Sequence, residues 1–362
     1  ALCYLNLATW FSRAPYNSLT GASRWNEPCV PVYTTGTSID TGGQPRESLR
    51  TVYGRIDQDI DRAIELLEKA RETTLAENNK SHINLYVALG IKSRACLAEG
   101  DWDGAFKAAK RVIDEGGYAV GTKSDLTGGM NSLDKQNVMW GAGIQVADQA
   151  GGYAGFFTHM DNKEGAYAKS APKLISKQLY NRISATDIRR DWWDPSDKES
   201  PYVSKKFSFA NVASFLGDYI YMRVEEMYFT AAEAALRLDD LKSARELMNT
   251  VMAERDPGYS ANNRSGTLLG ATTTTWTGSF LENILTLRRI ELWGEYGRLF
   301  DVRRLGQGID RRTDDGFSEE CISMMNRRNV NITKADTYDW VLTIPKAELD
   351  ANPNINEEDQ NP

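Results

Sequence analysis

Apolar residues recur every three or four positions along several stretches of this chain, and that spacing most strongly constrains its fold. Between positions 49 and 67 the apolar residues with this spacing are Leu49, Val52, Tyr53, Ile56, Ile60, Ala63, Ile64 and Leu67. Charged residues occupy many of the positions between them, as on the solvent-facing side of an amphipathic helix. The pattern predicts a helix of about five or six turns that packs one face onto a core.

A first pair of helices is predicted at about 83–99 and 102–115. Between them stands the sequence Gly100-Asp101-Trp102. Glycine adopts the left-handed conformation that commonly ends a helix, and aspartate accepts a hydrogen bond from the first backbone N–H groups of the next helix. These turn signals predict two antiparallel helices.

A second pair lies far downstream. Its first helix is predicted from an apolar seam that consists of Tyr221, Val224, Tyr228, Ala231, Ala235 and Leu238. The turn Asp239-Asp240-Leu241 matches Gly100-Asp101-Trp102 in register. This register resembles the tetratricopeptide repeat, in which small residues let two helices pack closely. An unrelated pair of antiparallel helices is the alternative.

The segment between the two pairs has a different composition. We predict one mainly α-helical unit with three parts, which are an N-terminal tetratricopeptide-like part (1–116), a loop-rich insertion (117–218) and C-terminal helices (219–362). The insertion contains a Gly-rich aromatic run at 151–157, and one short helix is expected at 172–183. Loops this long in a compact protein are usually functional, so the insertion is the expected ligand-binding region.

Charge and motif content exclude several functions. A net charge of −7 disfavours a nucleic-acid groove, which needs a basic surface to replace counterions. The sequence lacks the signatures of serine hydrolases, zinc proteases, P-loop proteins and EF-hand proteins, and no apolar run is long enough to span a bilayer. With two histidines and four scattered cysteines, we expect no catalytic site, cofactor or metal. Cys3 and Cys96 are interpreted as core residues of helices.

The densest charged segment runs from Arg288 to Gly306. If it formed one helix, Arg288, Glu291, Glu295 and Arg298 would be successive neighbours on one partly apolar face. Charges on such a face are tolerated only when they are paired. We interpret them as a buried ion-pair ladder that fixes how the helix docks. A catalytic constellation is the alternative.

The same segment resembles the C-terminal signature of the SusD/RagB family, roughly R-x-x-E-L-x-x-E-x-x-R-x-x-D-L-x-R-x-G. The matching positions are Arg288, Glu291, Leu292, Glu295, Arg298, Asp301, Arg304 and Gly306, while Val302 replaces the usual leucine. Other segments that resemble family motifs are Arg223, Glu226 and Ala232-Glu233-Ala234, then Ile344-Pro345-Lys346-Ala347-Glu348-Leu349, Asn352-Pro353-Asn354 and Gln360-Asn361-Pro362. The resemblance extends over essentially the whole chain.

This resemblance implies a fold and a function. SusD-like proteins have a scaffold of tetratricopeptide-type helix pairs and a loop-rich ligand surface. They have no catalytic activity or obligatory cofactor, although some members bind calcium, for which this chain has no motif. They are lipid-anchored at the outer face of the outer membrane of Bacteroidota, where they cover a SusC-like TonB-dependent transporter and capture nutrients, usually oligosaccharides. The resemblance also implies that an export signal, a lipid-bearing cysteine and a first helical segment precede Ala1.

A sugar ring offers an apolar C–H face to aromatic rings and hydroxyl groups to polar side chains. Candidate ligand-binding residues are therefore aromatic and polar residues of the long loops, namely Trp25, Asn26, Tyr153, Phe156, Trp192, Asp194 and Trp276. Each of them could instead anchor its loop on the scaffold. Trp102, Trp293 and Trp340 lie on helical or core-like segments and are assigned to packing.

Three alternatives to glycan capture stay open. The same scaffold could take peptides or another non-sugar nutrient. A repeat adaptor would bind only proteins and would lack a concave aromatic patch. A glycan-cleaving enzyme would need two carboxylates that face each other across a pocket at about 5–10 Å.

Overall fold

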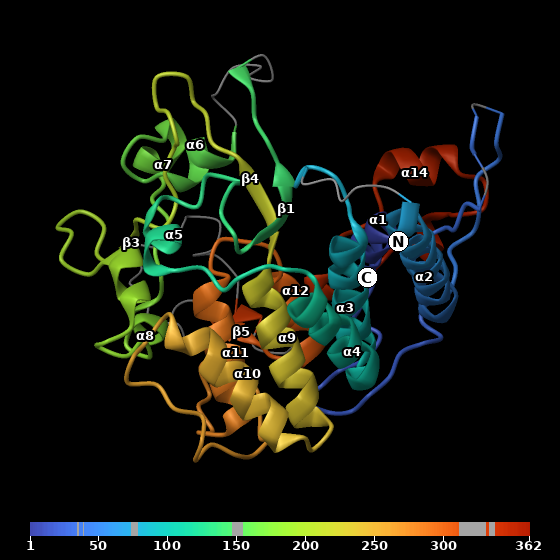
Figure 1. The fold of residues 1–362 in the computed structure, drawn as a ribbon. Helices are drawn as coiled ribbons and strands as arrows, with labels where there is room; N and C mark the ends of the chain where they lie inside the picture. Colours follow the sequence, from blue (N-terminus) through green and yellow to red (C-terminus); the bar gives the residue numbers. More distant parts are fainter. Residues whose placement is uncertain (35, 39, 74–78, 147–154, 311–330, 333–336) are drawn as a thin grey trace.

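Helices account for most of the regular structure in the computed structural model, which describes residues 1–34, 36–38, 40–73, 79–146, 155–310, 331–332 and 337–362. The long helices gather on one side of Figure 1, and the short elements of residues 117–218 project from the other. The predicted mainly α-helical fold is confirmed. Across the described ranges, no helix combines the length and apolar character needed to cross a bilayer.

The N-terminal part contains α1 (Leu2–Phe11) and α2 (Leu49–Thr73). The predicted apolar stripe lies on α2, where Val52 and Ile56 are fully buried against a small core that includes Leu5 of α1. Cys96 is buried as predicted. The prediction for Cys3 is wrong in one respect: it lies on α1 but is exposed, because α1 packs its other side onto α2.

Two hairpins have closely similar turns. The first joins α3 (Leu85–Glu99) to α4 (Trp102–Glu115), and the second joins α9 (Val224–Arg237) to α10 (Leu241–Ala253). Gly100 and Asp239 both have positive φ angles, 76° and 62°. The carboxylates of Asp101 and Asp240 each accept a hydrogen bond of 3.0 Å from a backbone N–H of the following helix. The predicted common register is therefore confirmed.

The two hairpins pack directly on one another. Helix α4 packs closely against α9, so segments far apart in sequence form one layer (Figure 1). Small residues allow this close approach, and those that are fully buried include Ser93, Ala105, Ala109, Ala231, Ala232 and Ala244. The tertiary contact, and not sequence proximity, joins the N-terminal and C-terminal helices.

The first helix of the second pair starts later than predicted. Tyr221 lies in β4 (Tyr219–Arg223), which pairs antiparallel with β1 (Val138–Ala142). Pairing with another strand overrides the helical spacing here, and the aromatic sequence Tyr-Ile-Tyr suits a strand. Consequently Tyr221 does not join the helical seam and is 40% exposed.

The other described elements between α4 and β4 are short. They are α5 (Lys123–Thr127), α6 (Phe156–Met160), α7 (Ala166–Ser170), α8 (Lys177–Tyr180), the 3-10 helix η2 (Ile188–Trp192), β2 (Trp193–Asp194) and β3 (Val203–Ser204). The helix expected at 172–183 is thus limited to α8. It begins after Ser176, whose hydroxyl accepts a hydrogen bond from the Leu179 N–H. Leu174 instead pairs with Val203.

The charged C-terminal segment is not one helix. It forms α11 (Phe280–Glu291) and α12 (Arg298–Leu305), and the turn between them contains Gly294 and Gly297 with φ angles of 75° and 112°. Such angles suit glycine and end the helix, so the predicted ladder along one helical face is wrong. Glu291 is buried and paired as predicted, since it accepts hydrogen bonds from arginines of other elements, whereas Arg298 is only half-buried.

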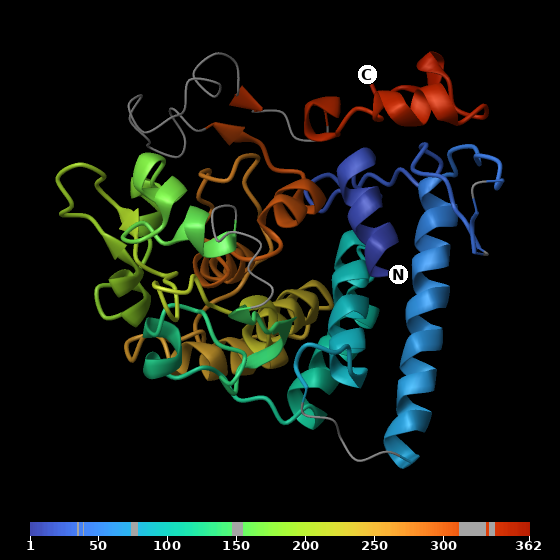
Figure 2. The same ribbon diagram turned by 90° about the horizontal axis from the view of Figure 1, so that it is seen from above.

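The end of the chain returns to its beginning. The last described elements are β5 (Ile309–Asp310), β6 (Asn331–Ile332), the 3-10 helix η4 (Tyr338–Trp340), α14 (Lys346–Ala351) and the 3-10 helix η5 (Glu357–Asp359). Figure 2 shows the part of this segment from η4 onward lying beside α1. The Leu342 N–H donates to the Trp10 carbonyl at 2.8 Å, and the Asn361 amide donates to the Phe11 carbonyl at 3.0 Å.

Candidate functional site

A cavity of about 470 Å³ lies at the two-stranded β1–β4 ribbon. It is also lined by α1, by the first residue of α6 and by the turn between α11 and α12. Its aromatic lining residues are Trp140, Phe156, Phe207, Tyr219, Tyr221 and Tyr296, and its other lining residues are Leu2, Asn6, Arg94, Met130, Ile220, Gly294 and Glu295. Residues from widely separated parts of the sequence therefore form one concave, mostly aromatic surface.

Two aromatic residues of the ribbon form one wall. The rings of Trp140 and Tyr221 meet edge to face, with centroids 5.0 Å apart and an interplanar angle of 68°. Trp140 is half-buried and Tyr221 is exposed. Within the described part of the chain, neither the indole N–H of Trp140 nor the hydroxyl of Tyr221 has a hydrogen-bond partner. Both rings are thus held in place and keep a polar group available to a ligand.

The turn between α11 and α12 forms another wall. A Cβ at Gly294 would come within 2.5 Å of the Phe207 ring, so only glycine lets the turn lie this close. The ring of Tyr296 covers the Arg94 guanidinium, whose central carbon lies 4.0 Å from the ring centroid. The Tyr296 hydroxyl donates to the Asn6 side chain at 3.1 Å, which connects this wall to α1.

The charged side chains among the described lining residues are paired within the protein. Arg94 donates to both carboxylate oxygens of Glu226, at 2.8 and 2.7 Å, and to the Tyr221 carbonyl at 2.9 Å. Glu295 accepts hydrogen bonds from Arg223 at 2.7 and 2.8 Å and from Lys206 at 2.6 Å. These pairs hold the cavity walls in position.

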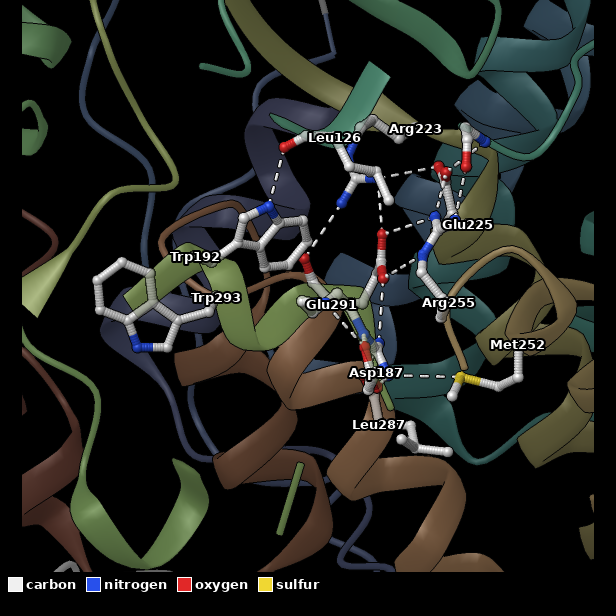
Figure 3. Close-up of polar contacts among 12 residues, drawn as sticks. Leu126, Asp187, Trp192, Arg223, Glu225, Met252, Arg255, Leu287, Glu291 and Trp293 are labelled. Atoms are coloured by element: carbon white, nitrogen blue, oxygen red, sulfur yellow. Dashed lines mark hydrogen bonds and ion pairs between the residues drawn. The ribbon is translucent and has the colours of Figure 1, made fainter. Parts of the chain in front are cut away.

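Behind the cavity lies a larger buried network of ion pairs (Figure 3). Its cations are Arg189, Lys206, Arg223 and Arg255, and its carboxylates are Asp187, Glu225, Glu291 and Glu295. Glu291 lies at its centre, between Arg223 and Arg255 in the figure. A second buried set continues from Arg94 through Glu226.

The network fixes the ionisation of its members. Burial raises the pKa of the Glu291 carboxyl, but Arg255, Arg223 and Arg189 together hold this pKa well below its usual range. Arg223 and Lys206 likewise lower the pKa of Glu295 against the effect of its burial. Burial lowers the pKa of Lys206 to about 8, although Glu295 favours its charged form. Both glutamates are therefore ionised and fully engaged at neutral pH.

The number of carboxylates at the cavity bears on whether it could cleave a glycosidic bond. Glu295 is the one carboxylate among its described lining residues, whereas hydrolysis of a glycosidic bond requires two that face each other. Nor does any group of three or more histidine, cysteine, aspartate or glutamate side chains in the described ranges have an arrangement that could hold a metal ion. The arrangement suits binding of a small polar ligand.

A family model described as the SusD family matches residues 160–362 of the sequence. The chain belongs to the SusD family. The resemblance inferred from its motifs is thereby confirmed. A search among curated proteins finds no significant match.

Solved structures of several proteins from Bacteroides species share the fold. A SusD-like carbohydrate-binding protein from Bacteroides vulgatus is 26% identical with a TM-score of 0.73, covering 98% of this chain and 74% of its own. A SusD superfamily protein from Bacteroides thetaiotaomicron is 23% identical with a TM-score of 0.73, covering 100% and 75%. Surface glycan-binding protein A from Bacteroides uniformis is 16% identical with a TM-score of 0.63, covering 99% and 75%.

Of the residues predicted to contact ligand in this SusD-family protein, Phe156 lies at the cavity and Trp192 does not. Phe156 lines the cavity, with its ring centroid 5.9 Å from that of Tyr219. Trp192 is only 2% exposed, and its indole N–H donates to the Leu126 carbonyl at 2.8 Å. Because the side chain is buried and the Lys206 ammonium lies over its ring, 4.4 Å from the centroid, Trp192 is a packing residue here, and the prediction needs this correction. Tyr153 lies outside the described residues.

The remaining predicted residues are not brought together. Trp25 is half-buried against Tyr53, with exposed Asn26 beside it. Trp276 lies beneath the Arg182 guanidinium, whose central carbon is 3.6 Å from the ring centroid. Asp194 lines a separate, more polar cavity of about 690 Å³. None of these four residues lines the aromatic cavity.

Sequence reasoning missed several lining residues of this cavity. They are Trp140, Tyr219, Tyr221, Tyr296, Asn6 and Arg94. The alternation Tyr219-Ile220-Tyr221 was an available strand signal. Its helical interpretation assigned Tyr221 to the core, and no local pattern connects Trp140 with Tyr296.

Proposed function

We propose that this SusD-family protein binds an oligosaccharide in the aromatic cavity and does not alter it chemically. The observation that carries the proposal is the Trp140–Tyr221 pair, a half-open aromatic surface at the wall of a cavity of about 470 Å³. A cavity of this size is within the usual range for small-molecule sites. The absence of a facing carboxylate pair among its described lining residues supports binding without hydrolysis.

The lining matches the chemistry of a sugar. The rings of Trp140, Tyr221 and Tyr296 offer faces for apolar C–H groups, while the Asn6 amide and the Arg94 guanidinium offer polar partners for hydroxyls. Burial of these apolar surfaces supplies affinity, and a few fixed polar groups supply orientation. Of the residues proposed from sequence, Phe156 belongs to this set.

Family membership supports a place for this binding in nutrient uptake. We infer that the protein acts at the outer surface of the outer membrane, held there by a lipid anchor. We further infer that it delivers its ligand to a SusC-like TonB-dependent transporter. The names of two structurally similar proteins from Bacteroides, one carbohydrate-binding and one glycan-binding, are consistent with an oligosaccharide as that ligand.

Titration calorimetry with a panel of plant and microbial oligosaccharides tests this proposal. We expect at least one oligosaccharide to bind the intact chain, and Trp140→Ala or Tyr221→Ala to weaken its affinity by about tenfold or more, since buried aromatic contacts commonly dominate binding energy. Trp276→Ala is the matched control, because this ring is covered by Arg182 away from the cavity.

The same titrations separate the possible outcomes. Trp140→Ala and Tyr221→Ala could leave the affinity unchanged while Trp276→Ala or Trp25→Ala reduces it. That result would show that the ligand binds at the loops that carry Trp25 or Trp276 and not in the aromatic cavity. If hydrolysis products of the oligosaccharide appeared in the calorimeter sample after long incubation, they would contradict a binding-only role. If the protein bound peptides but no saccharide, its ligand would be a peptide and not an oligosaccharide.

A further inference from the structure

The two charged side chains among the described lining residues of the aromatic cavity, Arg94 and Glu295, are both paired inside the protein. We propose that the cavity accepts neutral oligosaccharides and discriminates against those that carry carboxylate or sulfate groups. This inference rests on the proposed function, since it specifies the class of sugar bound at the same site. Its basis is the charge balance of the lining and of the network behind it.

Arg94 is the one cation among the described lining residues. Its Nε and Nη2 atoms donate to the two oxygens of Glu226, and Nη2 also donates to the Tyr221 carbonyl. Only Nη1 has no hydrogen-bond partner among the described residues. That single nitrogen suits one sugar hydroxyl, whereas a carboxylate or sulfate takes two parallel bonds from an arginine.

Glu226, the carboxylate that pairs with Arg94, is buried and depends on that pair. Glu226 is 3% exposed and also lies 3.6 Å from the Arg288 guanidinium. If a ligand carboxylate drew Arg94 away, it would leave a buried carboxylate with weaker compensation, which is costly in a medium of low dielectric constant. An anionic ligand therefore gains no free cation at this wall.

The charge of Glu295, in the turn between α11 and α12, is also balanced within the protein. The buried network that includes Glu295 contains four cations, Arg189, Lys206, Arg223 and Arg255, and four carboxylates, Asp187, Glu225, Glu291 and Glu295. Both oxygens of Glu295 already accept hydrogen bonds. With a net charge of −7 for the whole chain, neither the local nor the long-range field attracts an anion.

Matched pairs of saccharides test this inference. Acidic oligosaccharides such as oligogalacturonides, oligoalginates and hyaluronan fragments are titrated beside their own carboxyl-reduced forms and beside neutral glucans, xylans and mannans. We expect the saccharides that bind most tightly to be neutral, and each acidic form to bind at least about tenfold more weakly than its reduced partner. The affinity for a neutral ligand should stay constant between about 50 and about 500 mM salt, since no ion pair is formed.

A charge variant provides a second readout. Asn6→Lys would place an unpaired ammonium group at the cavity wall, and Asn6→Gln is its matched neutral control. We expect Asn6→Lys to reduce the discrimination against acidic forms by about tenfold and to make their binding salt-dependent, unlike Asn6→Gln.

The outcomes distinguish this inference from the proposed function. If an acidic saccharide binds the unmodified protein as tightly as its reduced form, or more tightly, the inference is wrong while oligosaccharide binding stands. If no saccharide of either kind binds, the proposed function fails, and the inference fails with it.

Discussion

At the scale of single residues, one carboxylate holds together distant parts of the chain. Glu291 accepts hydrogen bonds from Arg223 at 3.0 Å, from Arg255 at 2.9 and 3.0 Å and from Arg189 at 3.1 Å. These arginines come from the end of β4, from the residues after α10 and from η2. Since Glu291 is completely buried, its charge is essential to three guanidinium groups that have no access to water.

We therefore expect Glu291→Gln to destabilise the protein strongly. The amide keeps the shape of the carboxylate but removes its charge, and loss of one partner in a buried ion pair typically costs about 3–5 kcal/mol. The free energy of unfolding, measured with urea, checks this value. Glu65→Gln is the control, because Glu65 forms its ion pairs with Arg62 and Lys69 on the exposed face of α2, where no resolvable change is expected. Equal stability of the two variants would contradict a structural role for the network.

At the scale of elements, the carboxyl group of Glu99 lies where α3 packs on α2, in surroundings that disfavour its ionised form. Burial, followed by the charge of Asp57 on α2, raises the pKa of Glu99 from 4.5 to about 8. The positive charge of Lys92, which also binds Asp57 at 2.8 Å, lowers the pKa of Glu99 and partly offsets this rise. A carboxyl group with a raised folded-state pKa binds more protons in the folded than in the unfolded state. Its contribution to stability is therefore complete below about pH 4.5 and is lost as the pH rises towards 8.

We expect Glu99→Gln to remove part of this pH dependence. The amide needs no proton to be neutral, so the variant should gain at least about 1 kcal/mol over the natural protein at alkaline pH and little at acidic pH. Urea denaturation at about pH 5 and about pH 9 measures the difference. Asp103→Asn, a change at an exposed position of α4, controls for the general effect of removing a negative charge. Parallel pH profiles for Glu99→Gln and the natural protein would show that Glu99 ionises normally.

At the scale of the whole molecule, the N-terminal and C-terminal helices form one interlocked body. The α4–α9 interface and the buried Arg94–Glu226 pair connect residues 85–115 to residues 224–237. The C-terminal segment is hydrogen-bonded to the end of α1. Such connections tie the helices on both sides of the insertion to one another, which favours cooperative unfolding.

We predict a single unfolding transition for the described helical body. The midpoint in urea should be the same by far-UV circular dichroism, which reports the helices, and by tryptophan fluorescence, which reports aromatic environments. Hydrogen exchange should show residues 85–115 and 224–253 losing protection together. Two separate transitions, or early loss of the first hairpin alone, would instead show that the two hairpins are independent units.

The sequence predicted the parts of the fold that depend on neighbouring residues. Helical periodicity is set within three or four positions, and the hairpin turns depend on the φ angles of Gly100 and Asp239 and on the caps Asp101 and Asp240. The family motifs were visible for the same reason, since they lie in short ordered segments. Burial of the charged C-terminal signature also followed from its apolar surroundings.

Only the tertiary structure decided where the candidate site lies. Tyr221 became a cavity residue because β4 pairs with β1, and Trp192 became a core residue because other segments cover its ring. The charged segment turned at Gly294, which placed Tyr296 opposite the ribbon. Periodicity and capping are local interactions that the sequence determines by itself. A cavity wall depends on which distant surfaces meet, so its residues could be identified only once the chain was folded.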